Sequence, residues 1–356
     1  MAGEKTQEQG LTTADALLFA AAAGVAVGNL YWTQPLLARI AENFGVQASV
    51  GGHLMTATQV GYALGILLLV PLGDMANRRK LVTTLLALCA VLAVWGGWNV
   101  KTDRPVKHVA VTVPRLPADL DGLKIVQLTD IHVSPLYEKE RFTDLVKKVN
   151  AQNPDFIFIT GDIADGTPQS RRAIMPFLHD LKAKIGVVMI PGNHDYYVDY
   201  TAWRHYYKSI GVPFLENGHV EFRKGDDVIT VVGMTDRSGI QYGYPRPDIE
   251  KATFGADASN ALRIGLIHRP EDAAKWADPR WGLDLLLAGH THGGQIFIMY
   301  PSVWLQNHGY VRGLYHVGNI PFYVSPGIGS WSGTPTRIGA PTEITLLTLH
   351  SPEKTH

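Results

Sequence analysis

The sequence predicts an α/β domain built on buried strands, preceded by an all-α segment of about three membrane-spanning helices. Two observations support this prediction. Apolar residues are concentrated in the first hundred of the 356 positions. Beyond them, short β-branched runs alternate with amphipathic helical stretches, which is the pattern of a layered α/β core.

Composition narrows the possible partners. The chain has 32 Lys and Arg against 32 Asp and Glu, so its formal net charge is zero. Neutral charge and the lack of a basic stripe weigh against a nucleic-acid partner. The single cysteine, Cys89, excludes an intrachain disulfide framework. The length predicts two or three structural units and leaves the oligomeric state open.

Three apolar runs without charged residues lie near the N-terminus, at Ala16–Trp32, Leu54–Leu72 and Leu81–Val100. Each approaches the roughly 20 residues that cross a bilayer. Three buried helices of a soluble domain are the alternative. The basic cluster Arg78–Lys80 predicts a cytoplasmic loop by the positive-inside rule. Three crossings then predict a multi-pass protein of the cell membrane with everything after Lys101 outside the cytoplasm.

Residues 12–95 resemble the first helices of major facilitator superfamily transporters. The resemblance rests on "NLYWTQPLLARIAENFGV" and on "TATQVGYALGILLLVPLGDMANRRKLV", which carries the acidic-then-basic loop of that superfamily in Asp74, Arg78 and Arg79. Met75 replaces the usual Arg after the Asp. Such a transporter needs about a dozen helices around its central site, so we interpret residues 1–100 as an anchor. Both a natural fusion and a chimeric assembly account for this segment.

The second part of the chain begins with a linker. Residues 101–120 hold three prolines and mixed charge, which predicts a linker plus an edge strand. A domain over 121–349 and a short tail at 350–356 follow. Buried strands are predicted at 123–129, 155–160, 186–190, 262–267 and 283–288, and helices at 137–152 and 171–184.

Polar residues follow each of the five predicted strands. They are Asp130 and His132; Asp162; Asn193, His194 and Asp195; His268; and His290 and His292. Because ligands bind at the carboxyl ends of strands in α/β sheets, we expect these side chains to converge. Taken singly, each is an ordinary turn residue.

The residue types indicate a metal site. Carboxylate, imidazole and amide-oxygen donors suit Mn²⁺, Fe²⁺ or Fe³⁺ and Zn²⁺. Leaving His194 and Asp195 aside, the seven donors at the five strand ends exceed the needs of one metal and fit two divalent ions that share a carboxylate. Two cations about 3.5–4 Å apart clamp a phosphoryl group and produce hydroxide from a bridging water.

The ordered motifs "DIH", "GD", "GNHD", "H" and "GHTH" are similar to those of the calcineurin-like metallophosphoesterase superfamily. "GHTHGGQI", "YVSPGIGSW" and "TRIGAPTEITLL" resemble its membrane-associated bacterial branch. The resemblance covers residues 108–349 and implies a four-layer α/β/β/α sandwich with a dimetal site. Relatives in this branch include lipid-precursor pyrophosphatases.

The resemblance also implies roles for individual residues. Asp130, His132 and His292 would hold one metal; Asn193, His268 and His290 would hold the other; and Asp162 would bridge them. His194 would protonate the leaving oxygen or stabilise the phosphorane-like charge, and Asp195 would orient His194. "GSWSGTPTRIG" departs from the Trp-Gly-Pro-Pro form typical of the family, which leaves Arg337 as either a second phosphate contact or a structural arginine.

These observations predict a membrane-anchored, metal-dependent phosphoric ester hydrolase. A metal-bridging hydroxide would attack a phosphomonoester, a phosphodiester or a pyrophosphate, in a lipid-linked or nucleotide-sugar substrate. A transport-related protein and a non-catalytic metal sensor are the alternatives.

Overall fold

The computed structural model describes residues 48–102, 104–135, 137–257, 261–330 and 335–352, together with a few positions between 12 and 24. The chain divides into two compact units, Met1–Ala87 and Leu88–His356. The first predicted apolar run lies largely outside the described residues.

Two long apolar helices precede the α/β part. They are α3 (Ala48–Met75), which contains Pro71, and α4 (Arg78–Thr102). Among the described residues, one helix is long and apolar enough to cross a membrane, Arg78–Lys101, with a mean hydropathy of 2.0. The part of α3 over Gln59–Met75 is apolar but shorter. The prediction of three membrane-spanning helices therefore stays a prediction.

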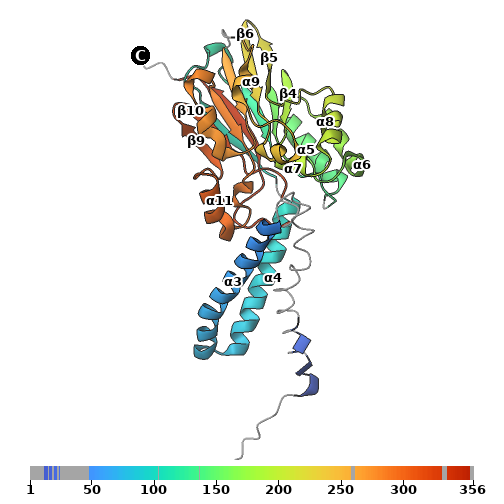
Figure 1. The fold of residues 1–356 in the computed structure, drawn as a ribbon, viewed down its shortest axis with the longest axis vertical. Coiled ribbons are helices and arrows are strands. Elements are labelled where there is room, and N and C mark those ends of the chain that lie inside the picture. Colours follow the sequence, from blue (N-terminus) through green and yellow to red (C-terminus); the bar gives the residue numbers. More distant parts are fainter. Residues whose placement is uncertain are drawn as a thin grey trace, which may run out of the picture. The chain divides into compact units, whose positions relative to one another are not determined.

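The second unit, which includes the end of α4 from Leu88 onward, contains two mixed sheets (Figure 1). The first has the strand order β1-β11-β2-β3-β4, with β2, β3 and β4 parallel and β11 antiparallel to β2. Its strands are β1 (Val106–Thr112), β2 (Lys124–Leu128), β3 (Phe156–Thr160), β4 (Gly186–Ile190) and β11 (Ile344–His350). Strand β1 lies at the edge of this sheet, parallel to β11, within the segment where an edge strand is predicted.

The second sheet has the order β5-β6-β7-β8-β10-β9. Its central strands β6, β7, β8 and β10 are parallel, and the edge strands β5 and β9 are antiparallel to their neighbours. The strands are β5 (Gly218–Lys224), β6 (Asp227–Gly233), β7 (Leu262–Leu266), β8 (Leu285–Ala288), β9 (Gly313–Val317) and β10 (Ile320–Val324).

Three apolar cores separate four layers. The alternation of side chains along β3 shows the arrangement: Phe156 and Phe158 point into the core between the sheets, whereas Ile157 and Ile159 face the helices. Each such fully buried side chain contributes about 1.5–3 kcal/mol of hydrophobic stabilisation. The layers are thus helix, sheet, sheet and helix, as the resemblance implies.

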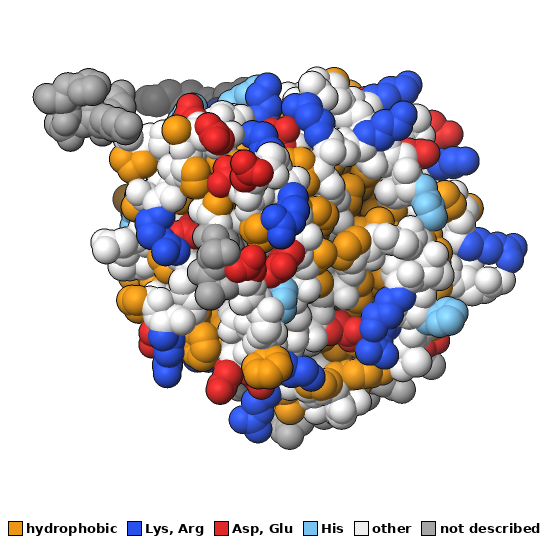
Figure 2. Space-filling view, turned by 90° about the horizontal axis from the view of Figure 1, so that it is seen from above, with side chains coloured by type: hydrophobic (Ala, Val, Ile, Leu, Met, Phe, Trp, Pro, Cys, Tyr) orange, Lys and Arg blue, Asp and Glu red, His pale blue; other side chains and the backbone are white. Residues whose placement is uncertain are grey.

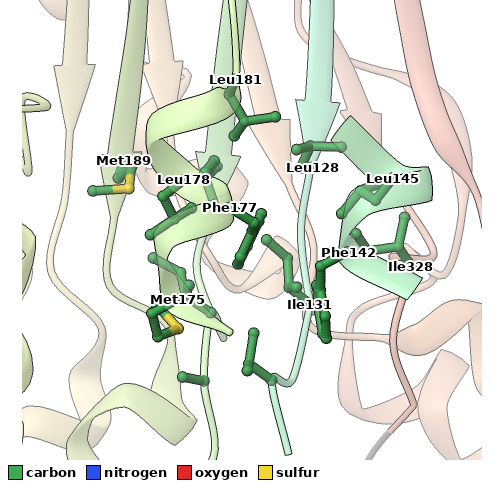
Figure 3. Close-up of a cluster of buried hydrophobic side chains, with 14 of the residues drawn as sticks. Leu128, Ile131, Phe142, Leu145, Met175, Phe177, Leu178, Leu181, Met189 and Ile328 are labelled. Atoms are coloured by element: carbon green, nitrogen blue, oxygen red, sulfur yellow. The ribbon is translucent and has the colours of Figure 1, made fainter. Parts of the chain in front are cut away.

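Helices cover the outer face of each sheet. Figure 3 shows Phe142 and Leu145 from one helix and Phe177 and Leu178 from another beside Leu128 of β2. The first sheet is covered by α5 (Lys139–Ala151), the 3-10 helix η2 (Met175–Asp180) and α8 (Tyr200–Ser209), near α6 (Pro168–Arg171). The second is covered by α9 (Ile249–Thr253) and α10 (Ala273–Trp276).

All five strands predicted from the sequence are present, as β2, β3, β4, β7 and β8. The helix predicted over 137–152 is α5. The helix predicted over 171–184 is wrong, because that segment forms only the end of α6 and the short 3-10 helix η2. Pro176 explains the difference, since proline lacks the backbone N–H that a longer α-helix would need there.

Candidate metal centre

The predicted ligands follow the carboxyl ends of strands from both sheets. Asp130 and His132 follow β2, Asp162 follows β3, and Asn193 begins the short helix α7 (Asn193–Tyr197) after β4. From the second sheet, His268 follows β7, and His290 and His292 follow β8. The site thus lies where the two sheets present the same end.

One group of side chains gathers Asp130, His132 and His292. The Nε2 atoms of the two histidines are 3.2 Å apart, and their rings stack with centroids 5.0 Å apart. Asp130 Oδ1 lies 3.4 Å from His292 Nε2. These three side chains are buried, so their donor atoms face one another instead of water.

A second group gathers Asp162, His268 and His290, whose ligand atoms lie within 4.8 Å of one another. Asn193 belongs beside them, because its Oδ1 is 3.0 Å from His268 Nε2. The rings of His268 and His290 have centroids 5.0 Å apart.

Asp162 connects the two groups. Its Oδ2 lies 3.6 Å from His132 Nε2 in the first group and 3.4 Å from His268 Nε2 in the second. Its other oxygen, Oδ1, accepts a hydrogen bond from the backbone N–H of His194 at 2.8 Å. One carboxylate oxygen therefore reaches both sets of donors while the other is held by the main chain.

The donor set fits divalent cations. Asp130 Oδ1 is buried and has no hydrogen-bond partner, which is costly unless a cation satisfies it. Burial lowers the pKa of His132, but the carboxylates of Asp165 and Asp162 outweigh it and raise that pKa to about 9. Burial also lowers the pKa of His268, but the carboxylate of Asp162 outweighs it and raises that pKa to about 10. In both cases the neighbouring carboxylates attract positive charge into the site.

The backbone at the site is strained. Five of the predicted ligands have a positive φ: Asp130 (50°), His132 (48°), Asp162 (52°), His290 (72°) and His292 (49°). Non-glycine residues rarely adopt this left-handed conformation, and such residues cluster at functional sites. The main chain is thus bent sharply after β2, β3 and β8 to turn these side chains inward.

Two glycines make room for the ligands. A Cβ at Gly192 would lie 2.2 Å from Asp162 Oδ1, and one at Gly289 would lie 2.0 Å from Thr129 Oγ1 and 2.6 Å from Asp130 Oδ2. Any side chain at either position would therefore displace a carboxylate of the site.

His194 is oriented by Asp165, which sequence reasoning missed. His194 Nδ1 is 2.8 Å from Asp165 Oδ1, and the same oxygen lies 3.2 Å from Nδ1 of His132. The prediction that Asp195 orients His194 is wrong. Both residues lie in α7, where successive side chains point about 100° apart, so Asp195 faces away from its neighbour. The available signal was "GDIAD", which places a second aspartate, Asp165, three residues after Asp162.

If the chain hydrolyses phosphoric esters at a metal centre here, we predict that Asp165→Asn lowers kcat about ten- to a hundredfold and leaves the number of metals per chain unchanged. The substitution removes the negative charge that holds the imidazoles of His194 and His132. Metal analysis of the purified variant, together with kcat for bis-p-nitrophenyl phosphate, checks this expectation. Wild-type kcat in the variant would contradict the positioning role of Asp165.

Asp195 instead supports the main chain of the site. Its carboxylate accepts hydrogen bonds from the backbone N–H of Gly192 (2.8 Å), Asp162 (3.0 Å) and Ile163 (3.3 Å), and from the hydroxyl of Tyr207 (3.2 Å). The side chain is completely buried. Asp195 thus fixes the loops after β3 and β4 against each other.

We therefore expect Asp195→Ala to act on stability. It leaves several buried donors without an acceptor, at a cost of about 1–3 kcal/mol for each. Thermal unfolding followed by tryptophan fluorescence should show a clear decrease in Tm. A variant with wild-type Tm and reduced kcat would instead support a direct role beside His194.

Two arginines also contact predicted ligands. Arg269 Nη1 lies 2.9 Å from His290 Nε2, and Arg269 Nε donates to Asp236 at 2.8 Å. Arg337 is completely buried and donates to the carbonyls of Gly329, Pro326 and His292. These contacts make Arg337 a structural arginine, which resolves the alternatives that the sequence leaves open.

Comparisons with known proteins place this chain in a family. The model of the calcineurin-like phosphoesterase family matches residues 123–294. The chain is 36% identical, over 271 residues, to a zebrafish (Danio rerio) protein named "Transmembrane protein with metallophosphoesterase domain". That match covers 74% of this chain and 61% of the zebrafish protein.

A bacterial relative is covered more completely. The chain is 35% identical over 247 residues to an uncharacterized metallophosphoesterase of Bacillus subtilis, and the match covers 66% of this chain and 82% of the relative. Among solved structures, a 5'-nucleotidase precursor from Thermus thermophilus matches with 15% identity and a TM-score of 0.42, over 64% of this chain and 54% of that one. The sequence relatives carry the assignment: the chain belongs to the calcineurin-like metallophosphoesterase family, a family of metal-dependent phosphoric ester hydrolases.

Proposed function

We propose that this chain is a membrane-anchored dimetal phosphoesterase that hydrolyses a phosphomonoester, a phosphodiester or a pyrophosphate. The observation that carries the proposal is the position of Asp162 Oδ2, within 3.6 Å of His132 Nε2 and 3.4 Å of His268 Nε2. A carboxylate shared between two donor groups is what a pair of neighbouring cations requires.

Some residues of the site would bind cations, and one would transfer a proton. Asp130, His132 and His292 would hold one cation, Asn193, His268 and His290 the other, and Asp162 both. When bound, two divalent cations polarise the phosphoryl group and lower the pKa of a water molecule between them. His194 is half-buried at the edge of the donor groups, and we assign it the proton delivered to the leaving oxygen. Asp165 holds the His194 ring through Nδ1, which directs Nε2 away from Asp165.

Membrane anchoring is the second part of the proposal. It is supported by the apolar helix Arg78–Lys101 and by the name of the zebrafish relative. The basic residues Arg78–Lys80, in the first turn of α4, favour a multi-pass arrangement with the catalytic unit outside the cytoplasm. The transporter-like origin of residues 12–95 and membership of the membrane-associated bacterial branch remain predictions.

We propose a lipid-linked or nucleotide-sugar substrate, because an anchored enzyme meets such molecules at or near the bilayer. The zero net charge of the chain disfavours a nucleic-acid substrate.

The test uses the full chain purified in detergent. We would measure metals per chain, and Mn²⁺-dependent hydrolysis of mono- and bis-p-nitrophenyl phosphate. Two metals per chain with turnover support the enzyme. Metals without turnover favour the sensor, and a folded chain with neither overturns the dimetal proposal. Solute flux in proteoliposomes would favour the transport-related alternative.

We predict that chelation abolishes the activity reversibly. The donor atoms are side chains on preformed loops, so removing the cations leaves the sheets in place and re-addition restores turnover. Hydrolysis is measured before EDTA, after EDTA and gel filtration, and after addition of Mn²⁺, Zn²⁺ or Fe²⁺. Activity that survives complete loss of metal would contradict the proposal.

A further inference from the structure

Residues 297–305, with the sequence FIMYPSVWL, form an exposed apolar segment. It covers the 3-10 helix η7 (Phe297–Met299) and most of α11 (Tyr300–Gln306). The exposed fraction reaches 75% at Ile298 and 68% at Leu305, with Phe297 and Trp304 also exposed. The stretch 293–311 contains no Asp, Glu, Lys or Arg. Single exposed apolar side chains are ordinary, but a continuous run marks an interaction surface.

The apolar segment continues the loop that carries two predicted ligands. His292 begins the 3-10 helix η6 (His292–Gly294), and Phe297 follows three residues after its end. Residues on both sides of Ile296 pair with Ile338: Phe297 N donates to the Ile338 carbonyl at 2.8 Å, and Ile338 N donates to the Gln295 carbonyl at 2.9 Å. The position of the apolar segment is therefore tied to that of the metal centre.

The same residues are bonded to the end of α4. Arg337 N donates to the carbonyl of Gly96 at 3.1 Å, and Asn99 Nδ2 donates to the carbonyl of Arg337 at 3.0 Å. The packing is close, since a Cβ at Gly96 would lie 2.3 Å from Thr336 Cγ2. Residues 336–338 thus connect the last turns of α4 on one side with the apolar segment on the other.

The bonds to α4 indicate how deep residues 336–338 would lie relative to a bilayer that α4 crosses. Gly96 lies five residues before Lys101, the last residue of the possible membrane span. At about 1.5 Å per residue, this corresponds to about 7–8 Å along the helix. Trp95 and Trp98 are exposed on the same turns, and tryptophan favours the interface between lipid and water. If α4 crosses a bilayer, residues 336–338 and Phe297 lie at headgroup level.

We propose that the apolar segment 297–305 inserts into the interface of the bilayer that α4 crosses, and so holds the loop of His290 and His292 at the lipid surface. This inference rests on the anchoring in the proposed function. A bilayer fits the segment because Phe, Tyr, Trp and Leu without charge are typical of interfacial membrane contacts. By contrast, the face in Figure 2 carries Lys, Arg, Asp and Glu side chains scattered among apolar ones.

The test places a fluorophore on the segment in the full chain. In a Cys89→Ser background, Ile298→Cys or Leu305→Cys is labelled with NBD and reconstituted into phosphatidylcholine vesicles containing doxyl-labelled lipid. Phe254→Cys is the matched control, because Phe254 is 83% exposed at the end of α9, and α9 and α11 lie at opposite ends of this unit (Figure 1). We expect at least threefold stronger quenching at 298 and 305 than at 254.

Other results would overturn the inference. Quenching at 298 and 305 that is as weak as at the control position 254 would mean that the segment stays in water. Blue-shifted emission at 298 without doxyl quenching would mean that a protein surface, such as a second copy of this chain, covers it.

Two further measurements on the same vesicles separate this inference from the proposed function. Release of the chain by alkaline carbonate would refute the anchoring, and the inference with it. A retained chain that hydrolyses bis-p-nitrophenyl phosphate but shows no quenching at 298 or 305 would refute the inference alone. Ile298→Ser with Leu305→Ser should keep wild-type turnover of this water-soluble substrate, because neither residue belongs to the metal centre.

Discussion

Asp162→Ala should abolish hydrolysis, with a fall in kcat of about a thousandfold or more, or about 4 kcal/mol of activation free energy. The reason is that Asp162 Oδ2 serves both donor groups, whereas every other predicted ligand serves one. The metal content should also fall below two per chain. Both quantities are measured on the full chain in detergent, with bis-p-nitrophenyl phosphate as substrate.

The control for this variant is Asp180→Ala, which removes an exposed carboxylate outside the site. It should keep the wild-type metal content and kcat. A Tm of Asp162→Ala close to that of the wild type would show that the loss is not caused by unfolding. Full activity of Asp162→Ala would refute the shared-carboxylate arrangement.

His194→Gln should lower kcat by about a hundred- to ten-thousandfold, the range for removal of a general acid. Both cations should remain, because the side chain of His194 belongs to neither ligand set. The kcat for phenyl phosphate should fall more than the kcat for p-nitrophenyl phosphate, since phenoxide is the poorer leaving group and depends more on the proton.

The leaving-group comparison separates chemistry from structure. A disturbed site would slow both substrates by the same factor and would lose metal. If kcat fell by the same factor for both substrates while the metal content stayed complete, the general-acid role would also be refuted. His194 would then be a group that only binds the phosphate.

Much of the site is predictable because strand ends are local features. A buried run such as 155–160 followed by Gly161 and Asp162 marks both a strand and its functional end without knowledge of the partner strands. The convergence of Asp130, His268 and His290 follows from the general rule that carboxyl ends of parallel strands meet at one edge. Seven predicted ligands are indeed brought together, although the strands belong to two sheets.

The remaining features depend on contacts between distant residues. Strand β11, at the C-terminal end, pairs between β1 and β2, and no local pattern specifies that pairing. The partner of His194 is set by how the loop after β3 packs against α7, so a neighbour in sequence was the wrong choice. The exposure of residues 297–305 is also invisible in the sequence, where an apolar run is equally typical of a core.

The left-handed backbone at five predicted ligands restricts which amino acids those positions can hold. Outside glycine, the side chains that tolerate this conformation best are Asn, Asp and His, and these are also donors for divalent cations. Substitutions at these positions are therefore restricted to a few amino-acid types. In a homologue that has lost its activity, we expect the first substitutions at these positions to be Asn and Gly, since both lower the torsional cost while keeping the turn. Sequences of such inactive homologues should show these substitutions before the strands of their sheets change.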